Sequence, residues 1–370
     1  MKLVLVHGYT MNNLGDDLFF RVLVERYPDV QFYLPTLNVS YKKKYKDIKN
    51  LKVIDFGGIS RFTTHQIYKL PKLYSRKYMK KFDAVVCIGG SLFIDRKNPS
   101  ANDQIEAENY SFICDWEYAQ KNNVPYFVLG ANWGPCYNKY FYEYFSRAFD
   151  SLTDICFRDQ YSYKLFSKKT MVRRSGDILM GHSLIKDAVH DCKKKKRVSI
   201  SVVDACRKCE ENCNASEYED KILQLSIELL AQGYELVLLS FCESEGDMDV
   251  ARRILEKIPI QYTKVSVLNY LHNWKEMLCI MAESEYIISS RFHATVLGWT
   301  VGTKVYSLTY GKKTVQMIND CGFELGYTEI WNMKDISFES IKKNAVCPSN
   351  IDQYSGETAF EKLDQLLNLA

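Results

Sequence analysis

The sequence contains no long hydrophobic run and no strong excess of charge of either sign. None of its apolar stretches approaches the roughly 18 residues that a membrane-spanning helix needs. The opening MKLVLVHGY has only a short apolar stretch before polar residues, which indicates a strand and not a secretory signal. The formal net charge is +4 over 370 residues, so composition gives no reason to expect a nucleic acid as a partner. These absences predict a cytoplasmic protein.

The sequence also lacks a convincing metal site. Cys206, Cys209 and Cys213 form the only dense cysteine cluster, but no fourth ligand stands at the spacing that zinc sites use. The chain has 12 cysteines and no signal peptide, which is typical of reduced thiols in a cytoplasm. We therefore expect no bound metal.

Short apolar strands alternate along the chain with segments of helical length. This alternation predicts α/β architecture with parallel sheets, and the length suffices for two domains. The strands that we expect are Leu3–His7, Gln31–Leu34, Ala84–Ile88, Tyr126–Leu129 and Ile155–Phe157 in the first half, and Val198–Val203, Glu235–Ser240, Ile287–Ser290 and Val305–Leu308 in the second.

The domain boundaries follow from a charge run near the middle of the chain. Lys193–Arg197 is an unbroken basic segment and the best candidate for a linker. We expect domains at residues 1–190 and 197–334, followed by a helical segment at 335–370. The same basic run would also suit an anionic membrane surface, so peripheral contact with the inner face of a membrane is an alternative.

The first candidate site is the turn that leaves the first strand. In HGYTMNNLGDD, glycines permit close backbone approach, and the start of the following helix attracts an anion or the polar edge of a sugar. The spacing fits neither a dinucleotide fingerprint nor a P-loop lysine. The alternative is that Asp16 and Asp17 only cap the helix.

The second candidate site is the segment Ser289–Ala294, which follows an apolar strand and opens a helix. Arg291 and His293 place a cation and an imidazole beside the backbone N–H groups of a helix start. This combination suits an anionic substrate and acid–base chemistry. The alternatives are a structural histidine and an arginine whose side chain turns into the protein.

Six motifs in order resemble those of the polysaccharide pyruvyl transferase family. They span roughly residues 8 to 320, almost the whole chain. Each motif is loose alone, but their order makes the resemblance fairly specific. The motifs are NNLGDD after the first strand, IGGSLFID at 88–95, GANWGP at 130–135, FRDQYS at 157–162, GD at 176–177 and SSRFHA at 289–294.

The resemblance implies a fold, an activity and a set of partners. The fold would be two Rossmann-like α/β domains in a GT-B-like arrangement with an interdomain cleft. The activity would be transfer of pyruvate from phosphoenolpyruvate to a sugar as a ketal, in cell-surface polysaccharide biosynthesis. Phosphoenolpyruvate would be a co-substrate, with no cofactor, and the sugar acceptor would be lipid-linked or not. The donor would bind mostly to the second domain and the acceptor mostly to the first.

The resemblance also implies site residues. His293 would be the general acid or base, because a histidine titrates near neutral pH. Arg158 would bind the donor carboxylate or merely pair with Asp159, and Lys313 or Lys312 would hold the donor's charge. The catalytic residues would be His293, Arg158 and Lys313, and the substrate-binding residues Asn13, Gly15, Asp17, Gly90, Ser91, Asp95, Arg291 and Lys312.

The sequence departs from the family pattern at two places. IGGS replaces GGGS at 88–91, and SVVD at 201–204 replaces a strand end that often carries serine and arginine. The second change removes an anion-binding arginine for which Arg207 could compensate. Two rival functions remain at this point, namely a GT-B glycosyltransferase that uses a nucleotide sugar and a non-catalytic sugar sensor.

Overall fold

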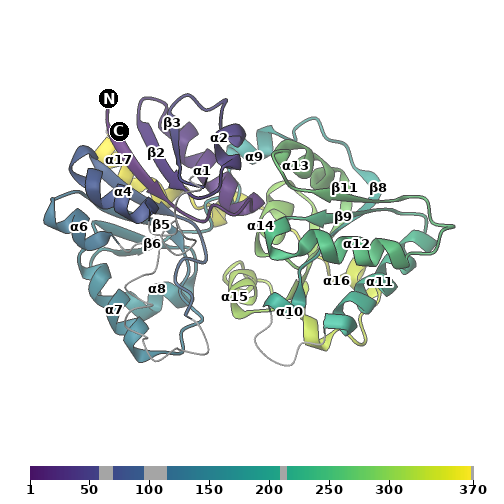
Figure 1. Cartoon of the computed structure of the whole chain (residues 1–370). Helices are drawn as coiled ribbons and strands as arrows, with labels where there is room; N and C mark the ends of the chain where they lie inside the picture. The colour runs from purple at the N-terminus through teal and green to yellow at the C-terminus, as the bar shows by residue number, and fades with distance from the viewer. Residues whose placement is uncertain (58–69, 96–114, 209–214, 368–370) are drawn as a thin grey trace. The chain divides into compact units, whose positions relative to one another are not determined.

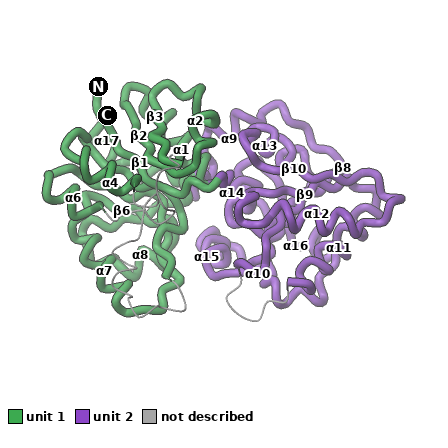
Figure 2. Tube along the Cα trace, in the orientation of Figure 1, with its two compact units in different colours: residues 1–11, 16–178, 356–370 green, residues 12–15, 179–355 purple. Residues whose placement is uncertain are grey.

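The computed structural model describes residues 1–57, 70–95, 115–208 and 215–367. The chain forms two compact units, which Figure 2 shows in different colours. Unit 1 comprises Met1–Met11, Asp16–Ile178 and Gly356–Ala370, and unit 2 comprises Asn12–Gly15 and Leu179–Ser355.

Unit 1 is built on a seven-stranded parallel sheet in the order β3-β2-β1-β4-β5-β6-β7. The central strands β1, β4 and β5 are almost continuously apolar, because helices cover both faces of a parallel sheet. The strands are β1 Leu3–His7, β2 Gln31–Thr36, β3 Leu51–Asp55, β4 Ala84–Ile88, β5 Tyr126–Ala131, β6 Asp154–Phe157 and β7 Val172–Arg174.

The helices of unit 1 pack on this sheet over a core rich in aromatic rings. Trp133 lies at the centre of that core, with its ring centroid 5.0 Å from that of Phe166. Phe149 contacts the same Phe166 ring at 4.9 Å, so much of the abundant aromatic content is structural. The helices are α1 Leu14–Arg26, α2 Ser40–Lys44, α4 Leu70–Tyr78, α6 Trp116–Lys121, α7 Lys139–Asp150, α8 Gln160–Phe166 and α17 Glu361–Leu367, with 3-10 turns at Met79–Lys81 and Glu357–Phe360 (Figure 1).

Unit 2 is built on a six-stranded parallel sheet in the order β10-β9-β8-β11-β12-β13. Its strands are β8 Lys195–Ser201, β9 Glu235–Ser240, β10 Val265–Asn269, β11 Ser284–Ser289, β12 Lys304–Thr309 and β13 Tyr327–Glu329. Its helices are α9 Ser183–Asp187, α10 Ala205–Lys208, α11 Ala215–Ala231, α12 Asp247–Lys257, α13 Trp274–Glu283, α14 Phe292–Thr300, α15 Lys312–Asp320 and α16 Phe338–Asn344, with 3-10 turns at Glu243–Glu245, Ile330–Asn332 and Ile351–Tyr354.

Each sheet reverses its strand order at one point. In unit 1 the reversal lies between β1 and β4, and in unit 2 it lies between β8 and β11. Crevices at the carboxyl ends of strands at such a reversal are where doubly wound sheets bind ligands. The turn after β1 and the segment Ser289–Ala294 after β11 both begin at these positions.

The units divide the chain differently from the expected domains. Unit 1 ends at Ile178, not near residue 190, because Thr300 of α14 donates a hydrogen bond to the Leu179 carbonyl and accepts one from the Gly181 N–H. Residues 356–367 return to unit 1, where Arg26 donates to Asp364 and Tyr27 donates to the same carboxylate.

The basic run Lys193–Arg197 is not a linker. Strand β8 begins at Lys195. Lys195 and Arg197 pair with Glu283, and the Lys194 ammonium donates to the Ser284 carbonyl oxygen at 2.8 Å. These pairings engage three of the cations within unit 2.

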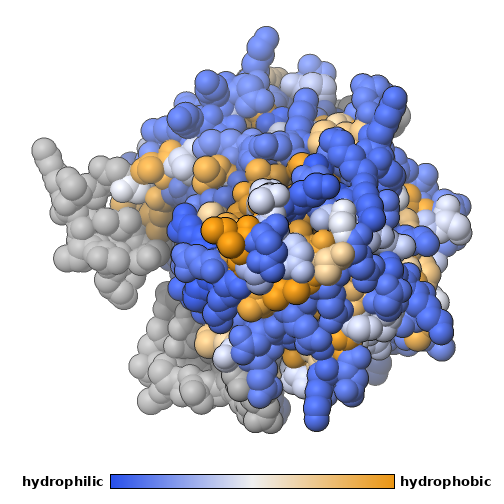
Figure 3. Space-filling model, turned by 90° about the vertical axis from the view of Figure 1, so that its right-hand side faces the viewer, coloured by the Kyte–Doolittle hydropathy of each residue, from blue (hydrophilic) through white to orange (hydrophobic). Residues whose placement is uncertain are grey.

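The described parts of the chain contain no helix that combines the length and apolarity needed to cross a membrane. Hydrophilic residues predominate on the face of the molecule in Figure 3, and apolar residues gather there in small groups. Exposed large apolar side chains include Ile260 and Leu271. Most large apolar side chains lie instead in the cores of the two units.

Candidate active site

His293 lies in the first turn of α14, directly after the carboxyl end of β11. Its ring is partly exposed and meets the Phe292 ring edge-on, with the centroids 5.2 Å apart. The backbone of Gly15 lies against the same imidazole, so closely that a Cβ at this position would overlap the ring. The structure therefore brings together two predicted site residues that are far apart in the sequence.

The turn that carries Gly15 is part of unit 2. Asn12 adopts a left-handed conformation with φ of 55°, which asparagine tolerates. The Asn13 side-chain oxygen accepts the Gly15 N–H at 3.1 Å, and the N–H of the buried Leu14 donates to the Phe241 carbonyl oxygen at 3.1 Å. The segment Asn12–Gly15 thus packs beside the end of β9 and not with the first sheet, where the acceptor side was expected.

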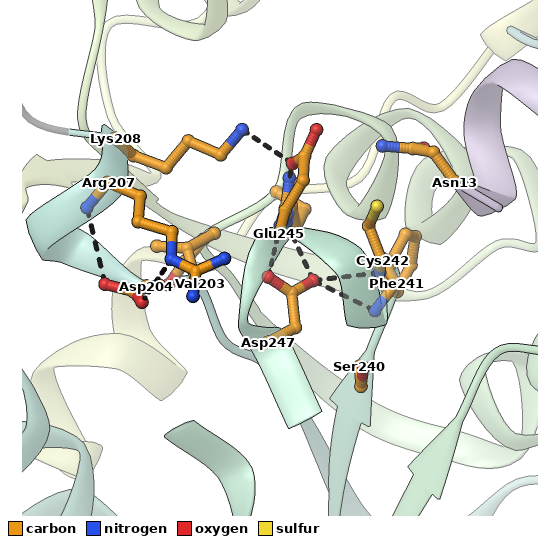
Figure 4. A network of polar contacts seen from close by, with 12 residues as sticks. Asn13, Val203, Asp204, Arg207, Lys208, Ser240, Phe241, Cys242, Glu245 and Asp247 are labelled. Atoms are coloured by element: carbon orange, nitrogen blue, oxygen red, sulfur yellow. Dashed lines mark hydrogen bonds and ion pairs between the residues drawn. The ribbon is translucent and has the colours of Figure 1, made fainter. Parts of the chain in front are cut away.

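Arg291 has its guanidinium turned into the protein. Its Nε donates to Asp247 at 2.9 Å, its Nη2 donates to the other oxygen of the same carboxylate, and its Nη1 pairs with Glu245. Asp247 also accepts the backbone N–H groups of residues 241–242, and Lys208 pairs with Glu245 at 2.6 Å (Figure 4). This geometry matches the alternative in which Arg291 has a structural role.

Burial and charge oppose each other at the Glu245 carboxyl. Burial raises its pKa, but the charges of Arg291 and Lys208 outweigh burial and hold the pKa well below its usual range. Glu245 is therefore ionised near neutral pH and fixes both cations at this end of the sheet.

Tyr310 directly follows the neighbouring strand β12, and Lys313 lies in the first turn of α15. The Lys313 Nζ is 5.9 Å from the centre of the Tyr310 ring, whereas Lys312 is exposed. Burial raises the pKa of the Tyr310 phenol, but the charges of Lys313, Arg291 and Lys208 together lower it below its ordinary value. The surroundings of Tyr310 are therefore electropositive, and Lys313 is the better placed of the two lysines to act there.

Arg158 lies in unit 1 at the end of β6. Its Nη1 pairs with Asp177 at 2.8 Å, and its Nη2 donates to the Asn132 side-chain oxygen at 2.7 Å. The guanidinium lies against Gly90, where a Cβ would overlap it. Asp159, the partner considered from the sequence, caps α8 by accepting the Ser162 N–H. Arg158 and Gly90, two of the predicted site residues, are thus neighbours.

The other predicted site residues of unit 1 lie at separate places. The Ser91 hydroxyl is 3.5 Å from the Asn132 side-chain oxygen. Asp95 accepts the backbone N–H groups of residues 137–138 at 2.9 and 2.7 Å and so orders the chain before α7. Asp17 is buried and pairs with Lys44 of α2. These contacts give Asp95 and Asp17 structural roles, whereas Ser91 remains near the Arg158 cluster.

Sequence reasoning missed most of the partners in these clusters. Asp177 and Asn132 stand in the motifs GD and GANWGP, which were the available signal. His7, at the end of β1, is paired with buried Asp115 at 3.0 Å. Burial raises the pKa of Asp115, but the charge of His7 and the hydrogen bonds from His7 and Tyr126 together hold that pKa below its usual value. Only the fold reveals this pair, because Asp115 is more than 100 residues away.

Among residues 1–57, 70–95, 115–208 and 215–367, no three or more His, Cys, Asp or Glu side chains are placed to hold a metal ion. Cys206 is exposed. The other two members of the cysteine cluster, Cys209 and Cys213, lie outside the described residues.

Comparison with known proteins identifies the family. A family model of polysaccharide pyruvyl transferases matches residues 13–312, which include the turn at Gly15 and the segment at His293. The chain belongs to the polysaccharide pyruvyl transferase family. Membership makes it a transferase of polysaccharide biosynthesis. It is also 20% identical over 385 residues to the amylovoran biosynthesis protein AmsJ of Erwinia amylovora, with 90% of this chain and 89% of the relative covered.

Solved structures of the same fold confirm the predicted fold class, α/β with two Rossmann-like domains of a GT-B-like fold. UDP-GlcNAc 2-epimerase from Methanocaldococcus jannaschii has a TM-score of 0.64 at 10% identity, with all of both chains covered. The UDP-GlcNAc-bound epimerase from Neisseria meningitidis also reaches 0.64, at 12% identity and the same coverage. At these identities the similarity to the pyruvyl transferase chain concerns the fold alone.

Proposed function

We propose that this protein transfers pyruvate from phosphoenolpyruvate to a sugar as a ketal, in the assembly of a cell-surface polysaccharide. Family membership supports the transferred group, and the similarity to the amylovoran biosynthesis protein AmsJ supports the polysaccharide context. The acceptor would be a sugar precursor, lipid-linked or not, and the protein would act at the cytoplasmic side.

The observation that carries this proposal is the contact between Gly15 and His293. Two family motifs from opposite ends of the matched region meet at the carboxyl edge of one sheet. A partly exposed imidazole held by packing in the first turn of a helix can act as a positioned acid or base.

Ketal formation from phosphoenolpyruvate requires a proton transfer that the His293 imidazole can perform. A sugar hydroxyl adds to C2 of phosphoenolpyruvate while C3 takes up a proton, and a tetrahedral phosphoketal forms. A second hydroxyl of the sugar then attacks C2, the bond from C2 to the phosphate oxygen breaks, and inorganic phosphate leaves with the proton of that hydroxyl. We assign the proton transfer to C3 to His293, because a histidine can hold or release a proton near neutral pH.

The donor carries a carboxylate and a phosphate, which need cations and N–H donors. Lys313 beside Tyr310 supplies positive charge in the unit that holds His293. We assign Arg158 to positioning, because its guanidinium is bound by Asp177 and Asn132 and supports the backbone at Gly90.

The test is a phosphate-release assay with phosphoenolpyruvate against a panel of lipid-linked and nucleotide-linked sugars, with UDP release measured on the same panel. Acceptor-dependent phosphate release, with a product heavier than the acceptor by one pyruvate ketal, is the expected result. UDP release without phosphate release would establish a glycosyltransferase instead, and binding without turnover would establish a sugar sensor. We also expect turnover to survive exhaustive chelation, since fixed cations can hold the donor.

A further inference from the structure

Thr309, the last residue of β12, has a buried hydroxyl. The residue is 2% exposed, and its Oγ1 makes no hydrogen bond within the part of the chain that the structure describes. Most buried polar side-chain atoms in folded proteins have a hydrogen-bond partner, because leaving one unsatisfied is costly. An unsatisfied hydroxyl at the carboxyl end of a strand therefore points to a ligand that supplies the missing partner.

The strand register places Thr309 at the start of α14. Ser307 is paired with Ser289 of β11, so Thr309 lies level with Arg291, the N-cap residue of α14. Side chains two residues apart on a strand share a face. The Ser307 hydroxyl bonds that of Thr295 in α14 at 2.9 Å, so Thr309 points to the same helix, one turn nearer its beginning.

A second helix begins beside Thr309. α15 starts at Lys312, and its N-cap residue Gly311 provides no side-chain hydrogen bond, as is also true of the N-cap of α14. No heavy atom of the described residues, chain neighbours aside, lies within 4 Å of where a Cβ of Gly311 would stand, so there is space at this helix start. Helix N-termini favour anions.

We propose that the Thr309 hydroxyl donates a hydrogen bond to a phosphoryl group bound between the N-termini of α14 and α15. On the basis of the proposed function, we assign this phosphoryl group to the phosphate of the donor, phosphoenolpyruvate. A phosphoryl group presents three oxygens in different directions, which suits a hydroxyl, two helix starts and the Lys313 ammonium better than a planar carboxylate does. The electropositive surroundings of Tyr310 agree with this assignment.

The test compares Thr309→Val with Thr309→Ser in the full chain, with inorganic phosphate as the probe. Valine keeps the shape and removes the hydroxyl. Calorimetric titration should show phosphate affinity weakened about tenfold in Thr309→Val and nearly unchanged in Thr309→Ser. Without phosphate, Thr309→Val should melt at the same temperature as the wild type or higher, because an unsatisfied polar atom has been removed.

Thr303→Val is the matched control, because Thr303 directly precedes β12 at its other end. The Thr303 hydroxyl donates to the Met281 carbonyl at 2.9 Å and accepts from Lys194, so its loss should lower the melting temperature and leave phosphate affinity unchanged. Equal phosphate affinity in the wild type and in Thr309→Val would overturn the inference. So would a Thr309→Val melting temperature as low as that of Thr303→Val.

Parallel titrations with phosphoenolpyruvate and with UDP identify the source of the phosphoryl group. A tenfold loss for phosphoenolpyruvate supports the assignment to the donor. A loss confined to UDP would keep the subsite and overturn that assignment, in favour of a nucleotide. These binding measurements need no turnover, so they test the phosphoryl subsite independently of the phosphate-release assay. Weaker phosphate binding in Thr309→Val would support the subsite even if no turnover were found. Unchanged phosphate binding would overturn the subsite even if turnover were found.

Discussion

The backbone of Gly15 packs against the imidazole of His293, leaving no room for a side chain at residue 15. Gly15→Ala should therefore displace the ring or the turn that carries Gly15. We expect lower unfolding free energy and lower phosphoenolpyruvate-dependent turnover. The double variant Gly15→Ala/His293→Ala should recover part of the stability because the clash disappears, with a coupling energy of about 0.5–3 kcal/mol in chemical denaturation. Strict additivity of the two single changes would contradict this contact.

His293→Gln should reduce turnover by about 100- to 10,000-fold, the usual contribution of a positioned acid–base group. Phosphate release from phosphoenolpyruvate measures this, with the melting temperature as a check on folding. His190→Gln is the matched control, because the side chain of His190 is 72% exposed and pairs with Asp191 at the surface. Turnover of His293→Gln within a few-fold of the wild type would remove His293 from the mechanism.

Lys313→Ala should raise the KM for phosphoenolpyruvate by about 10- to 100-fold, because a hydrogen bond to a charged group is lost. Lys312→Ala should have a much smaller effect, since Lys312 is exposed while Lys313 lies beside Tyr310. Initial rates measured over a range of phosphoenolpyruvate concentrations give the KM of each variant. A larger rise in KM for Lys312→Ala than for Lys313→Ala would show that Lys312, and not Lys313, contacts the donor.

Arg158→Ala should lower the unfolding free energy of the protein by about 3–5 kcal/mol, because it removes the guanidinium that pairs with the buried carboxylate of Asp177. Arg158→Ala/Asp177→Asn should regain part of this loss. Arg174→Ala is the control, since Arg174 is an exposed arginine on β7. Urea denaturation measures all three variants. Unchanged stability of Arg158→Ala, together with weaker donor binding, would show that Arg158 acts on the ligand directly.

Glu245 should make stability depend on pH in the acid range. The pKa of Glu245 is lower in the folded protein than the value of about 4.3 expected in the unfolded chain. Its contribution is therefore fully present above about pH 4.3 and declines as the pH falls toward the lower folded pKa. In urea unfolding between pH 6 and 3, the stability advantage of the wild type over Glu245→Gln should shrink as the pH falls.

Glu256→Gln is the control for this measurement, since Glu256 is an exposed glutamate on α12. The difference in unfolding free energy between Glu256→Gln and the wild type should stay constant over the same pH range. The difference in unfolding free energy between the wild type and Glu245→Gln could instead stay constant or grow toward low pH. Either result would show that Arg291 and Lys208 do not hold Glu245 in its ionised form.

The central strands could be predicted from the sequence, and the edge strands could not. β1, β4 and β9 have the predicted bounds. The strands that were not predicted are the edges of the two sheets, namely β3, β7, β10 and β13. An edge strand is partly exposed and carries polar residues, so it lacks the continuous apolar run of a strand buried on both faces.

The site was predictable only as far as local patterns reach. A strand followed by Arg291 and His293 at a helix start is visible in the sequence, and the structure places both residues there. The partners of Arg291 are Glu245 and Asp247, which come from another strand–helix connection. Arg158 likewise pairs with Asp177, which lies 19 residues further along the chain. Ion pairs of this kind depend on which strand ends the fold brings together.

The return of α17 to unit 1 has a consequence for the order in which the protein can fold during translation. Residues 179–355 emerge from the ribosome before Asp364, whose carboxylate binds Arg26, the last residue of α1, and the adjacent Tyr27. Unit 2 therefore has its full set of residues while unit 1 still lacks α17. Because domains fold largely as units as they emerge, the unit that begins first is the one completed last. A nascent chain arrested before residue 356 would expose the side of α1 that α17 covers, and that exposed surface is where a chaperone would be needed.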